Sequence, residues 1–118
     1  MNYFCETSVR AKLLENSDSG LRVCQHGALL AVLGHFTASH EPAVVSLPTG
    51  AGKTDLMFAL AFGLQANRIL IIDPSKFLRA QTSDRLRRLA LLRTKGFLSR
   101  DHDAPAVNEV KTTLRTTE

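Results

Sequence analysis

Four stretches of this sequence carry apolar residues at helical spacing, and two short runs between them are apolar at nearly every position. The helical stretches are 7–15, 21–36, 53–66 and 76–93, where apolar side chains return every three or four residues. The run 43–47 predicts a buried strand, and the run 69–72 predicts an inner strand of a parallel sheet. Ser75 directly precedes the last helical stretch and is a suitable N-cap for it.

A strand, a helix and a second strand in this order predict a right-handed parallel crossover. The 118 residues suffice for one domain, but open parallel sheets usually contain more than two strands. We therefore expect an α/β fold with an incomplete parallel sheet flanked by helices, formed by the first part of a larger domain. The apolar pattern decays late in the chain, which predicts a polar, poorly ordered tail over 94–118.

The composition narrows the class of protein. Hydrophobic residues make up 44% and charged residues 22%, which excludes a disordered tail, a collagen-like fibre and a disulfide scaffold. The net charge of +4 is compatible with a phosphate-rich partner. The two cysteines form no CxxC pair, which is typical of reduced thiols. Because no apolar run approaches the roughly 18 residues that span a bilayer and no signal peptide is visible, we expect a cytoplasmic protein without a membrane partner.

The segment 47–54, Leu-Pro-Thr-Gly-Ala-Gly-Lys-Thr, is the strongest chemical signal in the chain. Its glycines allow successive backbone N–H groups to face one anion, and the following helix adds the positive end of its dipole. Lys53 is suited to reach the β- and γ-phosphates of a nucleotide, and the Thr54 hydroxyl is suited to bind Mg²⁺. We therefore expect Lys53 and Thr54 to be the catalytic residues. The predicted nucleotide-binding residues of this region are Pro48, Thr49, Gly50, Ala51, Gly52, Lys53, Thr54 and Asp55.

This segment resembles motif I of superfamily-two helicases and translocases of the DEAD/DEAH type, especially the ATPase subunits of type I and type III restriction enzymes. The segment 21–25, Leu-Arg-Val-Cys-Gln, is similar to the upstream glutamine motif, and 69–81 is similar to motif Ia. The broad phosphate-loop pattern has glycine where this chain has Leu47, so the match is to a narrower variant. The resemblance covers about 21–92 and implies a RecA-like P-loop NTPase domain over 1–118 that uses ATP and Mg²⁺.

The resemblance also implies roles for residues outside the loop. Gln25 would select ATP over GTP, because a side-chain amide can both donate to and accept from adenine; the alternative is a helix-surface glutamine without a partner. The implied nucleic-acid contacts, which follow motif Ia, are Pro74, Ser75, Lys76, Arg79 and Gln81.

A basic stripe of Lys76, Arg79, Ser83 and Arg87 on the last predicted helix supports these contacts, although a merely solvated helix face explains the stripe equally well. The implied partners are the backbone of DNA or RNA, with DNA favoured, and the remainder of a helicase motor or other subunits.

Hydrolysis in such motors needs an acidic motif II and arginines from a second lobe, and the sequence contains no match to a DEAD or DEAH tetrapeptide. We therefore expect these residues to bind ATP without hydrolysing it or unwinding nucleic acid. Two alternatives stay open. Asp73 follows an apolar run and could hold Mg²⁺ in a small P-loop kinase or switch. The chain could also be a basic nucleic-acid-binding module whose loop is a relic.

Overall fold

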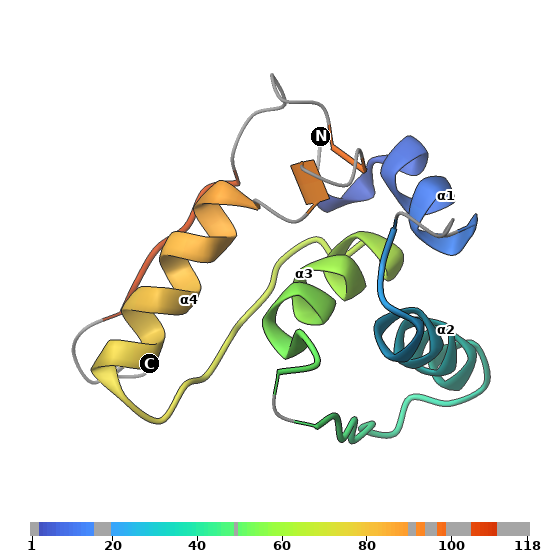
Figure 1. Ribbon diagram of the computed structural model, residues 1–118, viewed down its shortest axis with the longest axis horizontal. Coiled ribbons are helices and arrows are strands. Elements are labelled where there is room, and N and C mark those ends of the chain that lie inside the picture. The colour runs from blue at the N-terminus through green and yellow to red at the C-terminus, as the bar shows by residue number, and fades with distance from the viewer. Residues whose placement is uncertain are drawn as a thin grey trace, which may run out of the picture.

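The computed structural model describes residues 3–15, 20–48, 50–89, 92–93, 97–98 and 105–110. Its elements are a 3-10 helix η1 (Tyr3–Cys5) and the α-helices α1 (Thr7–Glu15), α2 (Val23–Ala38), α3 (Lys53–Gly63) and α4 (Lys76–Arg88) (Figure 1). All four predicted helical stretches are thus confirmed as helices, although α3 and α4 end before the predicted boundaries. Most of the predicted tail over 94–118 lies outside the described residues.

Local hydrogen bonds and backbone angles account for the helix ends. At the start of α2, the backbone N–H of Arg22 donates to Gln25 Oε1 at 3.0 Å, which is one half of a capping box. At the start of α4, the side-chain oxygen of Ser75 accepts from the backbone N–H of Leu78 at 3.2 Å, as the sequence predicted. This helix ends where Leu89 takes a left-handed φ of 46°, which stops the helical progression.

The predicted α/β fold with an incomplete RecA-like parallel sheet is wrong: the described residues form helices and contain no strand. The segments 43–47 and 69–72 run as non-helical chain that is largely exposed, with Val44 at 96% and Ile72 at 84%. A strand needs hydrogen bonds to a neighbouring strand, and an isolated pair is only marginally stable in water. An apolar run predicts the tendency to form a strand, but it does not supply the partner.

The core lies where η1, α1 and α2 pack around α3. Phe62 of α3 is completely buried, and its ring meets the ring of Phe4 at a centroid distance of 5.0 Å in an edge-to-face arrangement. Leu13 of α1 and Leu29 of α2 are also completely buried against this cluster. Because α2 and α3 pack together here, the loop that enters α3 lies beside the start of α2.

Most of the fourth helix lies apart from this core, and only its C-terminal end reaches it. In Figure 1, α4 and the non-helical segment before it lie on the opposite side of the molecule from α2. Leu89 at the end of α4 joins the core together with Leu92, Phe97 and Leu98, so the C-terminal end of α4 is anchored. Within the part of the chain that the structure describes, none of the helices combines the length and the apolar character needed to cross a membrane.

Candidate phosphate-binding site

The two glycines of the loop adopt the left-handed conformation that the motif requires. Gly50 has a φ of 83° and Gly52 a φ of 87°, values that other residues rarely adopt. Between them, Ala51 is buried and its N–H donates to Pro48 O at 3.1 Å, which closes a turn. The loop is therefore a compact turn rather than an extension of the preceding segment.

The third helix begins at Lys53, as the sequence predicted. Its N-cap is Gly52, which has no side chain to cap the helix. The N–H groups of the first turn point out of the helix end because no carbonyl lies four residues before them within the helix. With the helix dipole they make an end that attracts anions. Lys53 is exposed and Thr54 is half-buried at this end, so both are accessible to a ligand there.

Side chains from the start of α2 hold the carbonyl groups of the loop. Arg22 Nη1 donates to Gly50 O at 2.6 Å, and Gln25 Nε2 donates to Gly52 O at 3.1 Å. The thiol of Cys24 lies 3.9 Å from Ala51 O, between these two contacts along the chain. In a trans peptide the C=O and the following N–H point in opposite directions. The N–H groups of Gly52 and Lys53 therefore point away from the side chains of α2 that hold the carbonyl groups.

Gln25 is the most closely packed polar residue of this site. It is only 3% exposed, and its amide is used at both ends, since Oε1 accepts from Arg22 N and Nε2 donates to Gly52 O. A Cβ atom added at Gly52 would overlap with Gln25 Nε2. The structure thus places Gln25 against the loop as a support, a role that the sequence reasoning missed. The spacing of three between Arg22 and Gln25, typical of a capping box, was the available signal.

Charged residues surround the first turn of α3. Partial burial raises the pKa of the Asp55 carboxyl, while Arg85 and Arg22 lower it to a smaller extent. Arg85 lies on α4, so the fourth helix contributes positive charge near the first turn of α3.

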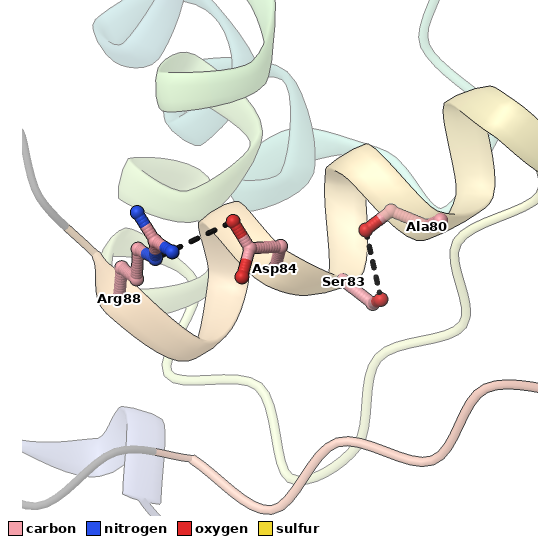
Figure 2. Close-up of polar contacts among 4 residues, drawn as sticks. All are labelled: Ala80, Ser83, Asp84 and Arg88. Atoms are coloured by element: carbon pink, nitrogen blue, oxygen red, sulfur yellow. Dashed lines mark hydrogen bonds and ion pairs between the residues drawn. The ribbon is translucent and has the colours of Figure 1, made fainter.

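The predicted nucleic-acid contacts lie on α4 and on the residues just before it. Pro74, Ser75, Lys76 and Gln81 are exposed, and Arg79 is half-buried. Figure 2 shows Ser83 on a different side of α4 from the exposed ion pair of Asp84 and Arg88, whose atoms lie 3.3 Å apart. That pair is too solvated to contribute much stability.

A groove of about 400 Å³ runs between 69–73 and 105–110, over the side of α4 that carries Arg79 and Ser83. Asp73 lines this groove, whose lining includes no residue of 47–54. In this groove Asp73 lies beside Arg79 and Ser83 of α4, so the groove gives no support to the kinase alternative, which needs Asp73 at the loop. Thr49, also predicted to bind nucleotide, lies outside the described residues.

The described part of the chain contains no group of three or more His, Cys, Asp or Glu side chains suited to hold a metal ion. A magnesium ion that arrives with a nucleotide does not need such a cage, because it usually takes one or two protein ligands together with phosphate oxygens and water. The hydroxyl of Thr54 in the first turn of α3 fits that requirement.

Comparison with known proteins gives one family. A family model described as "Type III restriction enzyme, res subunit" matches residues 18–118. No curated protein and no solved structure matches the chain. The matched range includes the loop and the three helices α2, α3 and α4 around it.

Proposed function

Because this chain belongs to the type III restriction enzyme res subunit family, a family of helicase-like ATPase domains, we propose that its loop 47–54 binds the triphosphate of ATP together with Mg²⁺. The observation that carries the proposal is the orientation of the loop. Its carbonyl groups are held by Arg22 and Gln25, so the amides at the start of α3 face the opposite side. Amides, helix dipole and an exposed lysine together complement a polyphosphate.

Three residues at this site then have a proposed chemical role. Lys53 neutralises charge on the β- and γ-phosphates, and the Thr54 hydroxyl is a ligand for Mg²⁺. Gln25 is only 3% exposed and is bonded at both ends of its amide, so the N–H and the oxygen lone pair that remain would reach adenine only after the start of α2 opens. The same residue would then support the loop and read the base.

The partners, the lack of turnover and the location of the protein are proposed from the same family membership. The partners are a nucleic-acid backbone, preferably DNA, at α4, and the remainder of a helicase motor. Turnover needs an acidic group near the Mg²⁺ and arginines from a second lobe, and Asp73 lines a groove beside α4 instead. We therefore propose binding without hydrolysis by these residues alone. Free thiols at Cys5 and Cys24 agree with a cytoplasmic location.

Calorimetric titration of the whole chain with ATP, ADP, AMP and GTP in the presence of Mg²⁺ tests the proposal. We expect affinity to fall from ATP to ADP to AMP, with at least about tenfold between ATP and AMP, because charge-assisted bonds to the outer phosphates are lost. GTP should bind more weakly than ATP if Gln25 reads the base. Equal affinities for ATP and AMP would show that the loop does not hold the phosphates.

A further inference from the structure

The basic stripe of α4 is occupied by another part of the same chain. Arg79 Nη1 donates to Val110 O at 3.1 Å, and Arg87 Nη2 donates to Val107 O at 3.4 Å. Between them, the hydroxyl of Ser83 lies 3.3 Å from Glu109 Oε2. Three successive members of the stripe, of which Arg79 is a predicted nucleic-acid contact, thus each meet an oxygen atom of 105–110.

These contacts satisfy the two arginines incompletely. The Nε of Arg79 is buried, and it has no acceptor among the residues that the structure describes. The bond from Arg87 lies near the upper limit of hydrogen-bond length. A guanidinium is best matched by two oxygens of one anionic group, such as a phosphate, rather than by a single carbonyl oxygen. A phosphate group would therefore be a better acceptor for these two arginines than the carbonyl oxygens that they contact in this structure.

We propose that residues 105–110 form an intramolecular clasp that competes with the backbone of a nucleic-acid strand for Arg79, Ser83 and Arg87. This inference rests on the nucleic-acid partner of the proposed function. The carbonyls of the clasp take the places of phosphate oxygens, and the carboxylate of Glu109 repels an approaching phosphate. Ser83 is only 8% exposed beneath the clasp, so a strand reaches it only after the clasp has moved away.

The substitution Glu109→Ala tests the clasp, with Glu41→Ala as its matched control. Both changes remove one exposed or half-buried carboxylate from a non-helical segment and raise the net charge equally, but Glu41 lies in the segment after α2. We expect Glu109→Ala to tighten binding of a fluorescent oligothymidylate at low salt by about three- to tenfold, the equivalent of one hydrogen bond and one repulsion removed. Glu41→Ala should change the affinity by less than about twofold, because it changes only the overall charge.

Cleavage of the unaltered chain by a glutamyl endopeptidase separates displacement of the clasp from a simple charge effect, because Glu109 lies in the clasp. Addition of the oligothymidylate should speed cleavage after Glu109, since a displaced segment is free to enter the protease. Equal effects of the two substitutions, no binding by any of the three proteins, or unchanged or slower cleavage after Glu109 would each overturn the clasp. Mg-ATP titrations of the same samples report on the loop separately, so loss of ATP binding with a working clasp would reject only the nucleotide site.

Discussion

Replacing Lys53 with alanine is expected to weaken binding of Mg-ATP by roughly ten- to a hundredfold. A hydrogen bond to a charged group contributes about 1.5–3 kcal/mol, and Lys53 is the one cationic side chain within residues 50–55. Lys53 is exposed, so its removal should leave the thermal unfolding temperature unchanged. A fluorescence titration with a labelled ATP analogue measures the loss.

The matched control for this prediction is Lys12→Ala. Lys12 is also an exposed lysine on a helix, but it lies on α1 and outside the loop. Its removal changes the overall charge in the same way and should leave the affinity for the analogue within about twofold of the unaltered chain. Similar losses in both variants would mean that ATP is attracted by net charge and not by the loop.

The substitution Gly52→Ala should impair both the site and the fold. At a φ of 87° a non-glycine residue costs about 1–2 kcal/mol, and the new Cβ would overlap with Gln25 Nε2. Displacing Gln25 also breaks its bond to the loop, which adds about 1 kcal/mol. We expect the free energy of unfolding to fall by about 2–3 kcal/mol and ATP affinity to fall more than about tenfold. Urea denaturation and the same titration measure the two effects.

Gly27→Ala is the control for this change. Gly27 lies inside α2, and a Cβ atom added there meets no other atom within 4 Å. Alanine in a helix is favoured over glycine by up to about 1 kcal/mol, so this variant should be slightly more stable and bind ATP normally. If Gly52→Ala behaved like Gly27→Ala, the left-handed turn and its contact with Gln25 would not matter for the site.

Helices were the part of this fold that could be predicted from sequence, because their hydrogen bonds and caps are local. The first helix has the predicted bounds 7–15, and α3 begins at the predicted Lys53. Ser75 caps α4 as expected. A helix depends mainly on residues three or four positions apart, so a short window of sequence contains most of the necessary information.

The two predicted strands were wrong because the pairing of one strand with another is not a local property of the sequence. The runs 43–47 and 69–72 have the composition of buried strands, yet among the described residues neither forms a strand. A strand is completed by hydrogen bonds from a distant segment, and the sequence of the run does not say whether that segment is in place. The apolar side chains of Leu70 and Ile72 consequently lie exposed.

The candidate site was predictable only in its local part, because its other contacts join distant segments of the chain. The glycines and the helix start follow from the motif, and their backbone conformation is confirmed. The contacts of Arg22 and Gln25 with the loop join residues more than 25 positions apart, and they depend on how α2 packs against α3. The contact of Arg79 with the clasp 105–110 is another long-range contact, and helix periodicity could not reveal it. The nucleotide, metal and nucleic-acid roles of the individual residues stay predictions.

Amide hydrogen exchange of the whole chain with and without Mg-ATP tests most directly whether the loop captures a polyphosphate. The account predicts slower exchange at residues 52–55, whose N–H groups lie at the start of α3, and unchanged exchange in α1. Unchanged exchange at 52–55 with saturating nucleotide, or protection confined to the groove between 69–73 and 105–110, would contradict it.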